Sequence, residues 1–163
     1  MVVFDASILI DLLNPRTASD RRAKLENLIL ELQKSKSKIQ IPTPALSEFL
    51  AGAGKARDSY YQKLSASSAF QVISFDARAA MECALMIDEV YTKADKQARI
   101  KTWAKAKFDW QIVAIAKVVG ATVIYSDDGD IERIGQRFGI KTIKTDDLPL
   151  PASARQGKLN LDA

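Results

Sequence analysis

The sequence predicts an α/β fold of three layers, in which a central parallel sheet of about five strands lies between two layers of helices. Short apolar runs alternate along the chain with helical segments, and the first run, Val2–Phe4, has the consecutive apolar residues of a strand buried on both faces. Crossovers between parallel strands are right-handed, which places helices on both faces of the sheet. The 163 residues are enough to bury one ordinary core.

The first two helices follow from the local pattern. Residues 6–13 are mostly apolar, and Asn14–Pro15 breaks the helix that they form. Ser19 or Asp20 is expected to cap a second helix that runs to about Lys36, because leucines and isoleucines recur there at steps of three and four residues. One stripe of this second helix is therefore expected to be buried.

The remaining strands are predicted from short segments of three or four residues between helical stretches, at residues 39–41, 70–73, 122–125 and 141–143. Helical segments separate them, at residues 44–53, 54–68, 77–91, 108–120 and 131–138. Pro44 opens the first of these helices, Asp76 can cap the third, and Gly120 ends the fourth. With the first strand, these runs complete a sheet of five.

Composition restricts the chemistry that the chain can perform. It contains no histidine, which excludes a histidine-based triad, a histidine-dependent ribonuclease mechanism and a histidine-ligated zinc site. The single cysteine, Cys83, falls in an alanine-rich helical segment and is expected to be inert packing, as suits a reducing compartment. Any catalysis must therefore depend on carboxylates, hydroxyls or lysines.

The chain is expected to be a soluble cytoplasmic protein with a weak preference for a polyanionic partner. Its 24 lysines and arginines exceed its 20 acids, and the pI is about 9.2. No basic region precedes the first apolar run, and no apolar stretch approaches the ~18 residues of a membrane span. We predict one domain at residues 1–147 and a C-terminal tail without periodicity at residues 148–163.

Four aspartates lie where predicted strands end. Asp5 follows the first strand, and Asp127, Asp128 and Asp130 follow the fourth. The carboxyl ends of parallel strands share one edge of a sheet, where open α/β sheets bind ligands. Helix capping accounts for one or two of the last three acids, and adjacent carboxylates repel by about 1 to 4 kcal/mol. A bound divalent cation is the natural neutraliser of such a group.

Two further acids lie on helices that are expected to start at that edge. Glu48 has only small neighbours one turn away, which leaves room around its carboxylate, although a glutamate in such a position is usually a surface residue. Asp109 shares an apolar face with Val113, and the alternative for it is an interaction with the helix dipole in a first turn. Ligands that are all oxygens favour Mg²⁺ or Mn²⁺ over zinc, and two such ions at a phosphodiester would activate water.

A basic stretch precedes Asp109. Its cations and its tryptophan are candidate nucleic-acid-binding residues: Lys96, Arg99, Lys101, Trp103, Lys105 and Lys107. Lysine and arginine screen phosphates, and an indole can stack on a base. The alternative is a solvated helical connection.

Four motifs in this order resemble those of PIN-domain ribonucleases, and most closely the VapC-type toxins of toxin–antitoxin pairs. The motifs are Phe4–Ser7, Glu48–Phe49, Asp109–Ala114 and Ser126–Ile131. The likeness extends from Val2 to about Ile143. It implies the PIN fold, with a sheet ordered 3-2-1-4-5 and an acidic pocket that holds Mg²⁺ or Mn²⁺.

The resemblance also implies a role for each matching residue. The catalytic acids and metal ligands would be Asp5, Glu48, Asp109 and Asp128, with Asp130 as a further ligand. Ser7 and Ser126 would support the acids by hydrogen bonds. Asp127 stands where the family usually has a polar or basic residue, and Ile131 replaces a usual aromatic. This leaves open which of Asp127 and Asp128 faces the metal, although the family's Thr-x-Asp-x-Asp run favours Asp128 and gives Asp127 a supporting role.

The function implied by this resemblance is endonucleolytic cleavage of single-stranded RNA by metal-activated water. A homodimer is implied as well, together with a cognate antitoxin whose C-terminal segment blocks the acidic pocket with an arginine or lysine. The alternative is a catalytically silent PIN-like module that binds RNA or a partner protein. A receiver-like domain would leave Glu48 and Asp109 without a role, and a haloacid-dehalogenase-like phosphatase requires a second aspartate where Ser7 stands.

Overall fold

The computed structural model describes residues 1–91, 96–152 and 154, without the side chains of residues 96–106. Its centre is a five-stranded parallel sheet with the order β3-β2-β1-β4-β5. The strands are β1 (Val2–Phe4), β2 (Ile39–Pro42), β3 (Phe70–Ile73), β4 (Val123–Tyr125) and β5 (Lys141–Ile143). The predicted fold class and strand order are confirmed.

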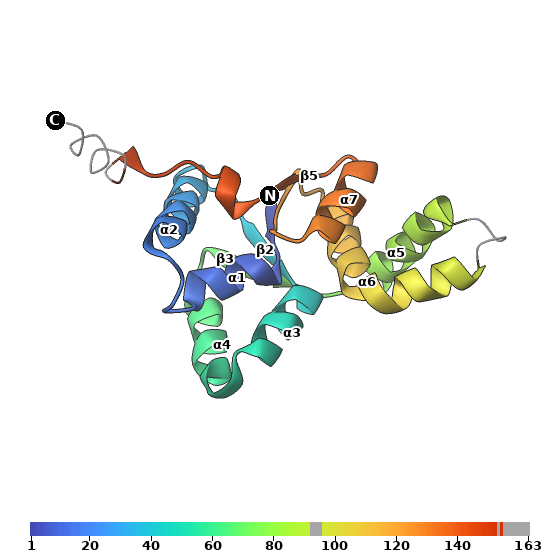
Figure 1. Ribbon diagram of the computed structural model, residues 1–163, viewed down its shortest axis with the longest axis horizontal. Helices are drawn as coiled ribbons and strands as arrows, with labels where there is room; N and C mark the ends of the chain where they lie inside the picture. The colour runs from blue at the N-terminus through green and yellow to red at the C-terminus, as the bar shows by residue number, and fades with distance from the viewer. Residues whose placement is uncertain (92–95, 153, 155–163) are drawn as a thin grey trace.

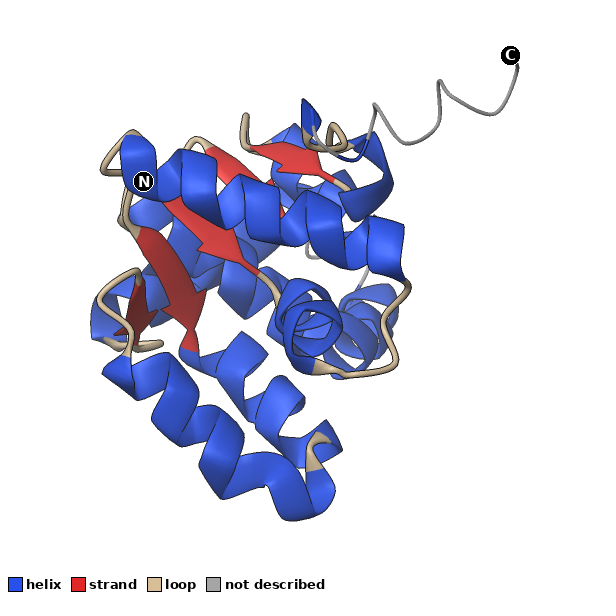
Figure 2. Ribbon diagram, turned by 90° about the vertical axis from the view of Figure 1, so that its left-hand side faces the viewer, coloured by secondary structure: helices blue, strands red, loops and turns tan. Residues whose placement is uncertain are grey.

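Helices cover both faces of the sheet, with the strands between them (Figures 1 and 2). One group contains α1 (Ala6–Leu13), α2 (Ser19–Lys34), α3 (Thr43–Gly52) and α4 (Arg57–Ala66). The other contains α5 (Ala77–Val90), α6 (Lys96–Val118) and α7 (Gly129–Arg137). Short 3₁₀ helices, η1 (Gly54–Ala56) and η3 (Thr145–Asp147), lie before α4 and after β5. Among the described residues, no helix is both long and apolar enough to span a membrane.

The core explains why β1 is the most apolar strand. It occupies the middle of the sheet, with Val3 opposite Gln40 on one side and Ile124 on the other. Val3 and Phe4 are fully buried, and the ring of Phe4 packs edge-on against Tyr125 at 5.4 Å between centroids. A strand enclosed by two neighbours and two helical layers favours apolar side chains on both faces. The first polar residue after it, Asp5, is therefore at the sheet edge.

Two predicted helix starts are wrong. Neither Ser19 nor Asp20 caps α2, because Ser19 is already its first residue and Ala18 holds the capping position. The helix predicted from residue 108 begins at Lys96 instead, so Asp109 lies well inside α6. The lysines, glutamine and alanines upstream are good helix formers, but the concentration of cations there led us to treat the segment as a separate basic stretch.

Three other local predictions are confirmed. Asp76 caps α5 by accepting a hydrogen bond from the backbone N–H of Ala79 at 2.9 Å. Gly120 follows α6 with a φ of +69°, a conformation that favours glycine. Cys83 is buried in α5, where burial raises the pKa of its thiol to about 11. It therefore stays protonated and packs as a small apolar residue.

Candidate metal centre

Asp5 is the most deeply buried acid at the carboxyl edge of the sheet. It follows β1 directly, is 4% exposed, and also caps α1. Its Oδ2 accepts hydrogen bonds from the hydroxyl of Ser126 at 2.9 Å and from that of Ser7 at 3.0 Å. Burial raises its pKa, although these hydrogen bonds act in the opposite direction. The two serines thus hold a carboxylate that burial makes costly to ionise.

The turn between β4 and α7 brings two more acids to this edge. Asp128 caps α7, and its Oδ1 accepts hydrogen bonds from the backbone N–H groups of Asp130 at 2.6 Å and Ile131 at 3.3 Å. Asp130 lies in the first turn of α7. Asp109, Asp128 and Asp130 can each offer a carboxylate oxygen within 4.8 Å of the others. These three acids come from two elements that are distant in sequence.

The position of Asp109 inside α6 removes the helix-dipole explanation for its carboxylate, since that effect is confined to the first turn. The pKa of Asp109 is raised to about 7, first by burial and then by the charges of Asp128, Asp5, Asp130 and Glu48. A carboxyl in this setting holds its proton near neutral pH unless a cation compensates for the surrounding negative charge.

Glu48 joins the group from α3, a helix that contacts α6. It is exposed, and its pKa is raised by partial burial and by the charges of Asp5 and Asp128. Five acids from β1, α3, α6 and the start of α7 therefore act on one another electrostatically. Among the described residues, Arg133 is the cation that pairs with this group, through Asp130 at 2.8 Å.

A model of the PIN domain family matches residues 2–136 of this sequence. The chain belongs to the PIN domain family. No curated protein sequence matches it. The PIN fold is also seen in solved structures of low sequence identity. One is a VapBC2 complex from Rickettsia felis bound to a promoter DNA fragment, with 17% identity, a TM-score of 0.60, and coverage of 88% of this chain and 98% of the other.

Two further solved structures share this PIN fold. A DNA-bound VapBC from Salmonella typhimurium has 18% identity and a TM-score of 0.54, with coverage of 88% of this chain and 97% of the other. The Mycobacterium tuberculosis toxin VapC20, described as cleaving the sarcin–ricin loop, has 17% identity and a TM-score of 0.57, with coverage of 83% and 95%. At these identities the likeness extends to the fold alone.

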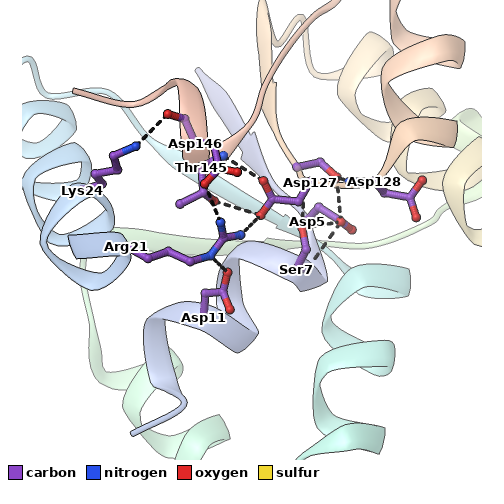
Figure 3. Close-up of polar contacts among 10 residues, drawn as sticks. Asp5, Ser7, Asp11, Arg21, Lys24, Asp127, Asp128, Thr145 and Asp146 are labelled. Carbon is purple, nitrogen blue, oxygen red and sulfur yellow. Dashed lines mark hydrogen bonds and ion pairs between the residues drawn. The ribbon is translucent and has the colours of Figure 1, made fainter. Parts of the chain in front are cut away.

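In this PIN domain, Asp127 and Asp128 face opposite ways (Figure 3). The carboxylate of Asp127 accepts hydrogen bonds from the backbone N–H of Thr145 at 2.8 Å and from the Thr145 hydroxyl at 2.9 Å, and it forms an ion pair with Arg21. Asp128 instead lies with Asp109 and Asp130. The geometry therefore gives Asp128, and not Asp127, access to a cation shared with the other acids.

The partners of Asp127 were not foreseen from the sequence. Arg21 lies in α2, where only an amphipathic pattern is visible, and Thr145 lies in η3, after the last strand and outside the family match. The one signal in the sequence is Asp127 itself, an acid at a position where the resemblance leads to a polar or basic residue.

The predicted RNA-binding residues lie on α6, upstream of Asp109. Lys107 is exposed, with its ammonium group 5.5 Å from the centre of the Phe108 ring. The other candidates lie in the part of α6 whose side chains are not described: Lys96, Arg99, Lys101, Trp103 and Lys105. The backbone shows that this basic stretch lies on the same helix as Asp109.

Proposed function

We propose that this PIN domain is a Mg²⁺- or Mn²⁺-dependent endoribonuclease that cleaves single-stranded RNA and acts as the toxin of a toxin–antitoxin pair. The observation that supports the proposal is the convergence of five acids from separate elements, three of which have a raised pKa. Grouped carboxylates without a matching set of cations are costly, and a hard divalent cation bound by oxygens removes that cost.

In the proposed mechanism, Asp5, Asp109 and Asp128 hold the cation and Asp130 is a further ligand. A cation bound by these residues would supply Lewis-acid chemistry, for activation of water and for neutralisation of charge on the phosphate. Ser7 and Ser126 orient Asp5 by donating hydrogen bonds to it. Glu48, exposed and close enough to sense Asp5 and Asp128, ligates a second ion or orients the attacking water. Chemistry of this kind needs no covalent intermediate.

The proposed partners follow from the family resemblance and from charge. The basic stretch from Lys96 to Lys107 guides the RNA backbone, with Trp103 available for stacking on a base. Two of the solved PIN structures are VapBC complexes, which favours a cognate antitoxin whose C-terminal segment enters the acidic pocket with an arginine or lysine. The protein is proposed to act in the cytoplasm as a homodimer.

Glu48→Gln tests the proposed role of Glu48. We expect it to reduce cleavage of a fluorescent single-stranded RNA in Mn²⁺ by about 100-fold, because the neutral amide cannot accept a proton from water and binds a divalent cation more weakly than a carboxylate does. The matched control is Glu26→Gln, which changes an exposed glutamate on α2 and is expected to cleave as the parent does. Equal cleavage by parent and Glu48→Gln would remove Glu48 from the mechanism.

The same assay separates the proposed nuclease from a silent binding module. The parent is expected to cleave single-stranded RNA in Mg²⁺ or Mn²⁺, to lose this activity in EDTA, and to recover it when the cation is restored. Isothermal titration with Mn²⁺ is expected to show specific binding that Asp109→Asn weakens. RNA binding with neither cleavage nor Mn²⁺ binding would favour the silent module.

A further inference from the structure

The side chain of Asp127 lies on the side of the β4–α7 turn that faces away from the five grouped acids, Asp5, Glu48, Asp109, Asp128 and Asp130. Thr145, which is fully buried, donates to it twice, through its backbone N–H at 2.8 Å and its hydroxyl at 2.9 Å. The guanidinium of Arg21 completes the set (Figure 3). Asp127 is thus anchored to α2 and to η3, two elements that carry none of the acids discussed above.

The opposite side of the same turn is tied to Asp5. The Ser7 hydroxyl accepts a hydrogen bond from the backbone N–H of Asp127 at 3.1 Å and donates to Asp5. The Ser126 hydroxyl accepts from the backbone N–H of Asp128 at 3.0 Å and also donates to Asp5. The turn that carries Asp128 is therefore fixed from both sides, and the Asp127 side chain provides one of the two attachments.

Arg21 also links Asp127 to two other elements of the domain. Besides Asp127, it pairs with Asp11 of α1 and with Asp146 of η3. The side chains of Asp11 and Asp127 are about three-quarters buried, whereas that of Asp146 is 88% exposed. Arg21 therefore supplies the direct ion pair of Asp11 and of Asp127, and Lys144 acts on Asp127 without contact, while Asp146 can rely on water.

We propose that Arg21 and Asp127 are positioning residues, whose ion pair holds the β4–α7 turn so that Asp128 faces Asp109 and Asp130. The inference rests on the proposed function, because the direction of Asp128 matters only if these acids bind a cation. Without Arg21, the partly buried carboxylate of Asp127 loses its direct ion pair beside other acids, and the turn relaxes. Residues that orient metal ligands in this indirect way typically contribute 10- to 100-fold to metal affinity or activity.

Arg21→Met is the decisive variant, because charge and positioning make opposite predictions for it. Removal of a cation near the site would tighten Mn²⁺ binding if long-range charge were all that Arg21 contributed. Loss of positioning would weaken it. We expect Arg21→Met to bind Mn²⁺ at least tenfold more weakly than the parent by isothermal titration, with kcat lowered about tenfold and KM for RNA unchanged.

Asp127→Asn and Arg21→Lys complete the test, and Asp146→Asn is the matched control. Asp127→Asn keeps the shape of the side chain but loses its charge, and we expect at least tenfold weaker Mn²⁺ binding. Arg21→Lys can engage fewer carboxylates at once, so it should recover part of the affinity. Asp146→Asn removes an exposed partner of Arg21 and should bind Mn²⁺ as the parent does.

The outcomes separate the inference from the proposed function. A parent that neither binds Mn²⁺ nor cleaves RNA would overturn both. A parent that does both, with Arg21→Met and Asp127→Asn within threefold of it in Mn²⁺ affinity and kcat, would overturn the inference alone. Lower thermal stability with unchanged Mn²⁺ affinity would mean that the ion pair is structural only. If Arg21→Met does not fold, Asp127→Asn and Arg21→Lys decide by the same criteria.

Discussion

Asp5→Asn is expected to reduce metal-dependent RNA cleavage by more than about 100-fold, the upper end of what residues outside the ligand set cost. Asparagine has the shape of aspartate, and its Oδ1 can accept the hydrogen bonds that Ser7 and Ser126 donate. The variant therefore removes a negative charge from the acidic edge and little else. Initial rates on single-stranded RNA, at saturating Mn²⁺ and at several lower concentrations, measure the effect.

The same variant should not destabilise the metal-free protein. Burial raises the pKa of Asp5, so its ionised form opposes folding at neutral pH, and a neutral amide removes that opposition. Thermal unfolding in EDTA at pH 7 is expected to give a Tm for Asp5→Asn equal to or above that of the parent. Asp58→Asn, a change at an exposed aspartate on α4, is the control and should leave cleavage unaltered. Parent-like cleavage by Asp5→Asn would contradict the catalytic assignment.

The sheet could be predicted from the sequence almost residue by residue. Strands such as Phe70–Ile73 and Lys141–Ile143 begin and end where predicted, because short segments with β-branched or aromatic residues between helical segments leave few other structures. The strand order came from the family resemblance, and the structure has the same order. Local chemistry also sufficed for Asp76, which caps α5. These features depend on neighbours in the chain, and the sequence displays those directly.

The features that could not be predicted depend on contacts between distant segments. The ion pair between Arg21 and Asp127 joins residues that are 106 positions apart, and a charged residue on an amphipathic helix gives no sign of its partner. The true start of α6 differs from the predicted one because the upstream half of the helix is rich in cations and resembles a separate solvated connection. The position of this boundary matters for Asp109, because a carboxylate well inside a helix is too far from the first turn to be stabilised by the helix dipole.

Asp109 is expected to make the stability of the metal-free protein fall as pH rises from about 4 to 8. Its pKa is about 7 in the folded chain, against an ordinary value of 3.8. At pH values between these two pKa values, the folded state therefore binds more protons than the unfolded state. The stability that this protonation contributes is complete below pH 4 and is lost above pH 7. A shift of about three units corresponds to at most ~4 kcal/mol, and partial exposure of Asp109 reduces this to about 2 kcal/mol.

Asp109→Asn isolates this contribution from the other titrating groups. In EDTA, the variant should be more stable than the parent by about 2 kcal/mol at pH 8 and nearly equal to it at pH 4, because the amide resembles the protonated carboxyl. Urea unfolding at pH 4, 5.5, 7 and 8 measures the difference between the two proteins. A difference that is constant across this range would mean that Asp109 titrates in its ordinary range when the protein is folded.

A bound cation should reverse the trend, and this reversal links the pH dependence to the proposed site. Mn²⁺ binding requires Asp109 to be ionised, so it must displace a proton whenever the pH is below about 7. We expect saturating Mn²⁺ to raise the Tm of the parent more at pH 8 than at pH 5.5, and to raise that of Asp109→Asn less at both. An increase that is the same at the two pH values would place Mn²⁺ at acids other than Asp109. Proton release measured on Mn²⁺ binding at pH 6.5 would show that the cation binds a carboxyl with a raised pKa.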